Sequence, residues 1–255
     1  MHDGTVGETA DGGLLMILAH PDDESFMVAG TMRAVAASGR RTALVCATRG
    51  DAGSVGDPPL ATRDTLAQVR EGELRDACAI LGVASVELLD YRDRHLADAP
   101  DDEIRASLVR VLRRERPRVV VTFDPNGVNR HPDHVAIARF ALDAVTAAAD
   151  DRWHPAAGPA HRVERVVWPS PVEPWAEWRP EALAQCAGVD FIVDVAAWQA
   201  DKARALRAHR TQHLGIEPRW FAPPAAEAIR STETFRLGWG RAVSVRPAGD
   251  LFAEL

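Results

Sequence analysis

The sequence predicts an α/β fold: a Rossmann-like three-layer sandwich in which helices cover both faces of a mainly parallel sheet, followed by a C-terminal extension. Short apolar runs alternate with longer helix-compatible stretches over the first 150 residues, which is the pattern of repeated strand–helix units. The 255 residues, 46% of them hydrophobic, suffice to bury one large core without disulfides. We find no apolar run as long as a membrane span.

The first two strands are short apolar segments. Residues 14–19 (LLMILA) predict a strand buried on both faces, as in a parallel sheet covered by helices. A helix over 25–38 follows and stops at Gly39, because glycine accepts the positive φ of a helix end. The second strand is expected over 42–48. Residues 49–62 are rich in Gly, Asp and Pro and predict a long loop, a feature that is often functional in compact domains.

The alternation of strand and helix then continues. Acidic residues open the helix over 101–116 and arginines close it, as the helix dipole favours. Beyond residue 150 prolines become frequent and the alternation weakens. The remaining elements are expected as helix 62–81, strand 86–91, helix 101–116, strand 118–123, helix 133–149, strand 163–168, strand 191–195 and helix 196–212.

The domain organisation follows from these changes in composition and in the alternation of strand and helix. Residues 1–13 are acidic and Gly-rich, lack the pattern of a signal peptide, and are expected to be flexible. Residues 14–255 are expected to form a single domain. Within it, residues 14–150 are expected to form the Rossmann-like half, and residues 151–255, which contain all seven tryptophans, a part that caps the substrate.

The predicted topology brings two strand ends together. Right-handed crossovers between consecutive strand–helix units predict the strand order 3-2-1-4. The strands over 14–19 and 118–123 are then neighbours at the point where the order reverses. Because ligands of open α/β sheets bind beyond the carboxyl ends of the strands at this point, the residues that follow these two strands should face one crevice.

Two related motifs occupy these positions. His20, Asp22 and Asp23 belong to an HPDDE segment, and His131 and His134 to an HPDH segment. Imidazole nitrogens with a carboxylate suit Zn²⁺ or a similar divalent ion. Adjacent aspartates cannot point the same way, so one can bind metal while the other faces the attacking water. The same reasoning applies to the two histidines.

Other interpretations compete with a metal site. Either motif by itself is compatible with a turn and a helix N-cap, but their occurrence after two neighbouring strands favours a metal site. A dinucleotide site is disfavoured because the first strand–helix turn lacks G-x-G-x-x-G and carries three acidic residues. Covalent catalysis is disfavoured because the sequence has no G-x-S-x-G elbow.

HPDDE, followed about 110 residues later by HPDH, resembles the LmbE-like (PIG-L) family of metal-dependent N-deacetylases. That family includes the deacetylases of mycothiol and bacillithiol synthesis and the enzyme that acts on N-acetylglucosaminyl-phosphatidylinositol. The resemblance covers residues 14–212. It implies these roles: metal ligands His20, Asp23 and His134, general base Asp22, electrophile and acid His131, and Asp133 holding the His131 ring.

Further residues carry over from the family with less specific motifs. Arg70 and Asp93 match substrate-binding positions of the family. The alternative for Arg70 is a place on a solvated helix face, and the alternative for Asp93 is a place in a capped loop. Asn129 stands where some relatives have a tyrosine that stabilises the oxyanion, and it is shorter. His209, in an A-H-x-[ST]-Q segment, is expected to be structural. Trp220, together with Trp175 and Trp178, is a candidate for packing on the aglycone or for the core.

The resemblance implies zinc-dependent hydrolysis of the N-acetyl group of an N-acetylglucosamine-type conjugate, releasing acetate and a free amine. Fe²⁺ or another divalent ion is the alternative metal. The alternative functions are an amidase that cleaves a larger amide, such as a mycothiol S-conjugate, and a catalytically silent sugar- or metal-binding protein. Asp22 and His131 argue against the silent protein, because binding by itself needs neither of them.

Charge and cysteine content bear on partners and compartment. A net charge of −7 provides no overall basic field for nucleic acid, so a small-molecule amino sugar is the expected partner. Neither nucleic acid nor a membrane span is expected, and the sequence leaves a homo-oligomer open. Cys46, Cys78 and Cys186 are widely spaced, which favours free thiols in the cytoplasm.

Overall fold

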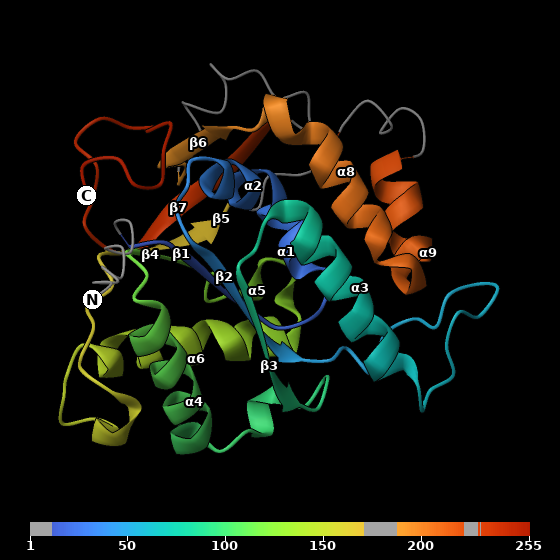
Figure 1. The fold of residues 1–255 in the computed structure, drawn as a ribbon, viewed down its shortest axis with the longest axis horizontal. Coiled ribbons are helices and arrows are strands. Elements are labelled where there is room, and N and C mark those ends of the chain that lie inside the picture. Colours follow the sequence, from blue (N-terminus) through green and yellow to red (C-terminus); the bar gives the residue numbers. More distant parts are fainter. Residues whose placement is uncertain (1–11, 171–187, 222–228, 230) are drawn as a thin grey trace, which may run out of the picture.

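The computed structural model describes residues 12–170, 188–221, 229 and 231–255. A twisted sheet of seven strands crosses the molecule in the order β3-β2-β1-β4-β5-β7-β6 (Figure 1). The first five strands pair in parallel, and β7 pairs antiparallel with β5 and β6. The strands are β1 (Leu14–Leu18), β2 (Thr42–Thr48), β3 (Ser85–Tyr91), β4 (Val119–Val121), β5 (Arg165–Pro169), β6 (Phe191–Asp194) and β7 (Thr232–Gly240).

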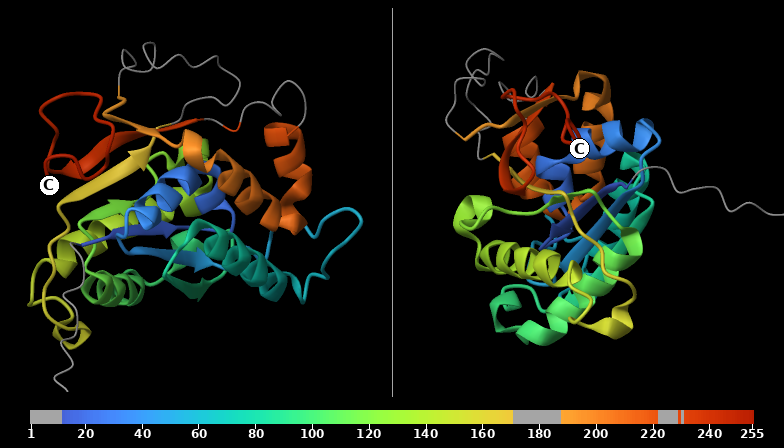
Figure 2. Two further views of the ribbon diagram at one scale, coloured as in Figure 1. Left: turned by 45° about the horizontal axis from the view of Figure 1, so that its top comes forward. Right: turned by 90° about the vertical axis from the view of Figure 1, so that its left-hand side faces the viewer.

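Helices cover both faces of the sheet. α4 packs beside α6 on one face, and α2, α3 and α8 contact one another on the other (Figures 1 and 2). The protein is therefore a three-layer α/β sandwich, as predicted. The helices are α1 (Asp23–Met27), α2 (Ala29–Ala37), α3 (Leu66–Leu81), α4 (Asp101–Glu115), α5 (Gly127–Arg130), α6 (Pro132–Ala148), α8 (Gln199–Ala208) and α9 (His213–Ile216).

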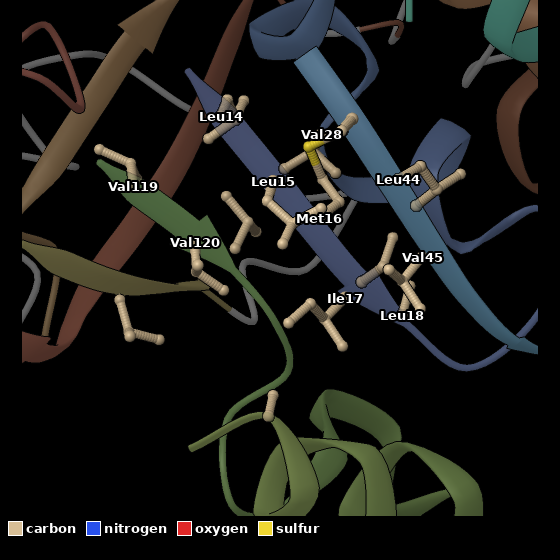
Figure 3. Packing of buried hydrophobic residues seen from close by; sticks show 14 of the residues in the cluster. Leu14, Leu15, Met16, Ile17, Leu18, Val28, Leu44, Val45, Val119 and Val120 are labelled. Atoms are coloured by element: carbon tan, nitrogen blue, oxygen red, sulfur yellow. The ribbon is translucent and has the colours of Figure 1, made fainter. Parts of the chain in front are cut away.

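The core is centred on β1. All five residues of this strand are buried, because it pairs with β2 on one side and β4 on the other and helices cover both faces. Figure 3 shows its side chains packed against those of Leu44, Val45, Val119 and Val120 from the two neighbouring strands. A strand buried on both faces needs apolar residues at every position, which explains the unbroken LLMIL run.

The predicted strand order 3-2-1-4 is confirmed, and β2 begins and ends where the sequence predicted. The single helix predicted over 25–38 is wrong: the segment forms α1 and α2, which are separated at Val28 with φ −134° and ψ 7°. The predicted helix over 196–212 is also too long, since α8 ends at Ala208 and His209 has ψ 64°.

The C-terminal part contributes a strand that the sequence analysis missed. β7 mixes buried, half-buried and exposed residues, so its hydrophobic pattern is weak, yet its pairing with both β5 and β6 joins β6 to the sheet. The predicted strands over 163–168 and 191–195 are confirmed as β5 and β6. Trp175, Trp178 and Cys186 lie outside the described residues. Within the part of the chain that the structure describes, no helix combines the length and apolarity needed to cross a membrane.

Candidate metal centre and active site

The two motifs meet at the carboxyl ends of neighbouring strands. β1 and β4 pair in parallel register, Leu14 with Val119, so the residues that follow each strand emerge at the same edge of the sheet. His20 comes two residues after β1, and Asp23 begins α1. His134 lies in the first turn of α6. The predicted convergence of HPDDE and HPDH is therefore what the fold produces.

The side chains of His20, Asp23 and His134 form a compact triangle. His20 Nδ1 lies 3.2 Å from His134 Nε2 and 3.6 Å from an oxygen of Asp23. The other Asp23 oxygen lies 3.3 Å from His134 Nε2. Ligands about 2.0–2.2 Å from a tetrahedral Zn²⁺ are separated by about 3.3–3.6 Å, so these four atoms of three side chains have suitable spacing for one divalent ion.

The charge distribution supports the same interpretation. Burial lowers the pKa of His20, but hydrogen bonds to Asp133, Asp23 and Asp93 outweigh it and raise the pKa to about 12. Burial raises the pKa of Asp23, yet His134 and His20 hold it well below its usual value. The centre therefore has an excess of negative charge that stabilises a cation, and its nitrogen and carboxylate donors fit Zn²⁺ or Fe²⁺.

The outer nitrogen of His20 is held by two carboxylates. His20 Nε2 lies 3.1 Å from Asp133 Oδ2 and 3.2 Å from Asp93 Oδ1. A proton on Nε2 leaves Nδ1 free to bind metal, so these carboxylates select the required tautomer. Possible ligand atoms also gather in two groups that overlap with the triangle at His20, one formed with Asp93 and Asp133 and one with His131 and His134.

The contacts of Asp133 correct one expectation. Its carboxylate accepts hydrogen bonds from the backbone N–H groups of Arg94 (2.6 Å) and Leu96 (3.1 Å) as well as contacting His20. His131 instead meets the backbone: its Nδ1 accepts from the N–H of Asp133 at 3.2 Å. The carboxylate thus orients His20 rather than His131. The sequence could not distinguish these arrangements, because both follow from an aspartate two residues after His131.

His134 is fixed from two directions. Its Nδ1 lies 3.1 Å from the carbonyl oxygen of Gly127, which leaves Nε2 facing the centre. The Phe123 ring stacks on its imidazole with centroids 3.9 Å apart and planes inclined by 8°. Gly127 has φ +65°, and a Cβ there would approach the His134 Cβ to 2.8 Å, so glycine permits this close approach.

Asp22 lies beside the triangle without being part of it. It has a φ of 109°, which is unusual for a residue with a side chain. Burial raises the pKa of Asp22 to about 6, although Arg70 opposes this shift. Arg70 Nη2 donates to Asp22 Oδ2 at 3.0 Å, and the same guanidinium donates to the carbonyl oxygens of Pro21 and Gly50. Arg70 is therefore a buried support of Asp22 rather than a residue of a solvated helix face.

His131 faces the same centre from the start of α6. Its ring centroid lies 4.7 Å from that of His20 and 4.9 Å from that of His134. Because Nδ1 accepts from the backbone, the neutral ring carries its proton on Nε2, where it can donate to a substrate oxygen. Burial and the neighbouring imidazoles lower the pKa of His131. The side-chain oxygen of Asn129 accepts from the His131 N–H at 3.0 Å.

The sequence analysis missed a buried pair that supports Asp22. Glu24, the last residue of HPDDE, accepts from the Asp22 N–H at 3.0 Å and lies 2.7 Å from His209 Nε2. Glu24 and His209 are both fully buried. His209 was expected to be structural, and this contact connects it to the backbone of Asp22. The only signal in the sequence is an acidic residue in an otherwise buried turn.

A polar cavity opens onto these groups. It encloses approximately 730 Å³ of space, open solvent included, and its walls include Asp22, His131 and Arg70. Asp93 and Asn129 also line it, so the three predicted substrate-binding residues border one cavity. Asp93 is nevertheless committed largely to other contacts, since its second oxygen accepts from the Ala52 N–H at 3.0 Å.

Imidazoles and carboxylates gather at the carboxyl edge of the sheet in this α/β sandwich. This arrangement is typical of enzymes that bind a divalent metal ion in their active site. Comparison with known proteins identifies the family. Residues 15–145 match the model of the PIG-L family, described as GlcNAc-PI de-N-acetylase. The chain belongs to this family, whose members are metal-dependent N-deacetylases.

Individual relatives agree with this assignment. A 1D-myo-inositol 2-acetamido-2-deoxy-alpha-D-glucopyranoside deacetylase from Streptomyces avermitilis is 36% identical, covering 95% of this chain and 97% of that protein. A conserved protein from Thermus thermophilus matches with a TM-score of 0.68 and 30% identity over 91% of this chain and 97% of its own. The N,N'-diacetylchitobiose deacetylase from Pyrococcus horikoshii shares the fold, with a TM-score of 0.67 and 23% identity over 88% of this chain and 83% of that one.

Proposed function

We propose that this protein hydrolyses the N-acetyl group of an amino-sugar conjugate, with Zn²⁺ as the resident metal. The observation that carries the proposal is the triangle of His20, Asp23 and His134 with the separate carboxylate of Asp22 beside it. Binding a metal needs only the triangle, whereas hydrolysis also needs a base. The relatives point to a 1D-myo-inositol 2-acetamido-2-deoxy-glucopyranoside as the first substrate to test.

The chain's own residues supply the remaining chemistry. A bound divalent ion polarises the amide carbonyl and makes water more acidic. Asp22 takes a proton from the attacking water as the hydroxyl adds to the carbonyl carbon. His131 Nε2–H donates to the developing oxyanion, and Asn129, which is bonded to the His131 backbone, borders the same space. The C–N bond then breaks, and the proton held by Asp22 or His131 passes to the leaving nitrogen.

Arg70 and Asp93 act mainly as supports in this proposal. Arg70 orients Asp22, and Asp93 orients His20, and each still presents part of its surface to the polar cavity. Sugar hydroxyls can therefore bond to their remaining donor and acceptor positions. We further propose that residues 151–255 cap the substrate, which is supported by the presence of Gln212 and Arg219 in the cavity wall.

The compartment proposed from the sequence is the cytoplasm. Cys46 and Cys78 are buried free thiols. Burial raises the pKa of both thiols well above the usual value, so they are poor nucleophiles. Free thiols at these positions support a reducing environment. Their raised pKa argues against a covalent role for them in the reaction.

The test is direct measurement of the reaction on purified protein. Release of acetate and of a free amine is followed for the inositol conjugate, for N-acetylglucosamine and for a mycothiol S-conjugate. We expect release of acetate from the inositol conjugate, loss of activity on chelation, and recovery of activity on adding Zn²⁺. Stronger recovery with Fe²⁺ would identify Fe²⁺ as the resident metal instead of Zn²⁺. Cleavage of the S-conjugate only would favour the amidase alternative. Metal binding with no hydrolysis of any substrate would favour the silent one.

A further inference from the structure

A second cavity adjoins the candidate metal centre on the side away from Asp22. It encloses approximately 900 Å³ of space, open solvent included, among the described residues. Five residues line both cavities, so the two meet at the candidate metal ligands: Asp23, Phe26, Asn129, His134 and Arg219. Asp22, His131 and Arg70 line the polar cavity and are absent from the described wall of the second.

The second cavity has a different chemical character from the first. Its walls include the side chains of Phe26, Met27, Phe123, Val128 and Trp220. The Trp220 ring packs on Phe26 with centroids 5.9 Å apart, and both belong to a small apolar cluster that also contains Leu206 and Ile216. These rings make a preformed apolar wall beside the centre. We refer to this space as the apolar cavity.

Of the charged groups that line the apolar cavity, Asp23 is a candidate metal ligand, and Arg219 also lines the polar cavity and so lies where the two cavities meet. The other two, Lys202 and Glu233, are paired with each other. Lys202 Nζ lies 2.5 Å from Glu233 Oε1, and each side chain is 3% exposed. Glu233 also accepts from the backbone N–H groups of Gly30 (3.0 Å) and Thr31 (2.8 Å). Since these partners satisfy the carboxylate and the ammonium, neither group requires a charged ligand. The cavity thus favours an apolar occupant.

The geometry of an amide assigns the two cavities to different parts of the substrate. The carbonyl carbon bears the acyl group and the nitrogen on opposite sides, so a carbonyl placed at the centre sends them in different directions. The polar cavity suits the amino sugar. The apolar cavity then receives the acyl group, and its several apolar side chains offer more contact surface than a single methyl can use.

We propose that the apolar cavity binds acyl groups longer than acetyl, so that the protein also removes linear butanoyl to hexanoyl groups from amino sugars. This inference rests on the proposed deacetylase function and extends it. The chemistry is unchanged: water adds its hydroxyl to the acyl carbon, the C–N bond breaks, and the amine gains the proton. The products are the longer carboxylate and the free amino sugar.

The first experiment varies the acyl chain at constant aglycone. Glucosaminides bearing acetyl, butanoyl and hexanoyl groups are compared by amine release. Burying a methylene can raise kcat/KM by up to about fourfold, so we expect kcat/KM to rise from acetyl to hexanoyl. A kcat/KM that falls from acetyl to butanoyl overturns the proposal while leaving the deacetylase function intact. Absence of hydrolysis with every acyl group would instead reject the proposed function.

A second arm varies the aglycone at constant acetyl, using methyl and hexyl glucosaminides. If the apolar cavity holds the acyl group, lengthening the aglycone changes kcat/KM less than lengthening the acyl chain. A larger gain from the hexyl aglycone would assign the cavity to the leaving group and overturn the proposal. Calorimetric binding of acetate, butanoate and hexanoate to the metal-loaded protein provides a readout independent of turnover. The affinity should rise with chain length, and equal affinities would contradict the assignment.

A cavity-filling variant locates the effect. Thr232 lines the apolar cavity at the start of β7, where an aromatic residue is compatible with a strand. In Thr232→Trp we expect the ratio of kcat/KM for hexanoyl to that for acetyl to fall at least tenfold, with Thr232→Ser as the matched control. An unchanged ratio in a folded Thr232→Trp protein would contradict the proposal. The carboxylate-binding series on the unaltered protein remains decisive if this variant does not fold.

Discussion

The two halves of the chain contribute to the site in different ways. Residues 14–150 supply the groups that converge on the candidate metal centre, from the segments that follow β1, β3 and β4. Residues 151–255 supply contacts that act through the first half: His209 on Glu24, Gln212 on Ser54 and Lys202 on Glu233, which in turn holds the start of α2. Reactive residues are thus placed by local sequence, whereas their support depends on contacts between residues distant in sequence.

The largest effect should come from the first half. His134→Ala removes one corner of the triangle, so we expect most of the metal and nearly all activity to be lost. Elemental analysis gives the metal content per chain, and acetate release gives the activity. His154→Ala, which alters a histidine far from the centre, is the matched control and should keep its metal. A metal-free His134→Ala protein with substantial activity would mean that the reaction does not use this centre.

A smaller loss of activity is expected from the second half. His209→Ala leaves the buried carboxylate of Glu24 without its main partner, so the Asp22 backbone that Glu24 holds is less well positioned. We expect the metal to be retained and kcat to fall by about tenfold or more, as for misplacement of a catalytic group. His213→Ala, at a half-buried histidine in the same segment that does not contact Glu24, is the control. His209→Gln, which can still donate to Glu24, should restore part of kcat; failure to do so would make His209 purely structural.

The same pair predicts a pH dependence of stability. Burial lowers the pKa of His209, but Glu24 outweighs it and raises the pKa above its usual value. A raised pKa means that the stabilisation is fully present below pH about 6.5 and decreases as the pH rises through the folded value. The difference in Tm between wild type and His209→Ala should therefore narrow at alkaline pH. A difference that widens with pH would contradict the charged pair.

A further prediction concerns the stability of the fold and leaves the candidate metal ligands unaltered. Lys202→Met leaves Glu233 buried without its cation, which should lower the free energy of unfolding by about 3–5 kcal/mol. Glu233→Gln combined with Lys202→Met removes the buried charge and keeps one oxygen, for the N–H of either Gly30 or Thr31, so the double variant should recover part of the loss. Denaturant unfolding measures both. Equal destabilisation in the two variants would show that the charge is not the cause.

The smallest effect is expected where the second half meets the loop of residues 49–62. Gln212 exchanges two hydrogen bonds with the backbone of Ser54, one of them from its amide to the Ser54 oxygen at 2.9 Å. Gln212→Ala should loosen this loop and raise KM severalfold with little change in kcat, because each bond contributes only about 1 kcal/mol. A change in kcat that exceeds the change in KM would place Gln212 closer to the reaction than the structure indicates.

The sequence was sufficient to predict the elements that have a clear local pattern of hydrophobic residues. Apolar runs identified β1, β2 and β4, and right-handed crossovers then determined which strand ends meet. β7 escaped prediction because half-buried strands far along the chain carry little periodic signal. The break at Val28 escaped because nothing in the local sequence opposes a continuous helix.

The same limit applies to the site. HPDDE and HPDH indicated which residues lie close together in the site. Which side chain contacts which depends on their directions in three dimensions. The Asp133 carboxylate therefore contacts His20 instead of the expected His131, and Arg70 supports Asp22. The Glu24–His209 contact joins residues 185 positions apart, a separation at which one sequence contains no information about pairing.

The central claim is that metal binding and proton transfer belong to adjacent but separate aspartates. Asp22→Asn tests it most directly, because the amide keeps the size of the side chain and its bond to Arg70 but cannot take the proton. Asp76→Asn, at an exposed position of α3, is the matched control. We predict that Asp22→Asn retains wild-type metal content while kcat falls by about 10²–10⁴-fold. Wild-type turnover in this variant, or loss of its metal, would contradict the account.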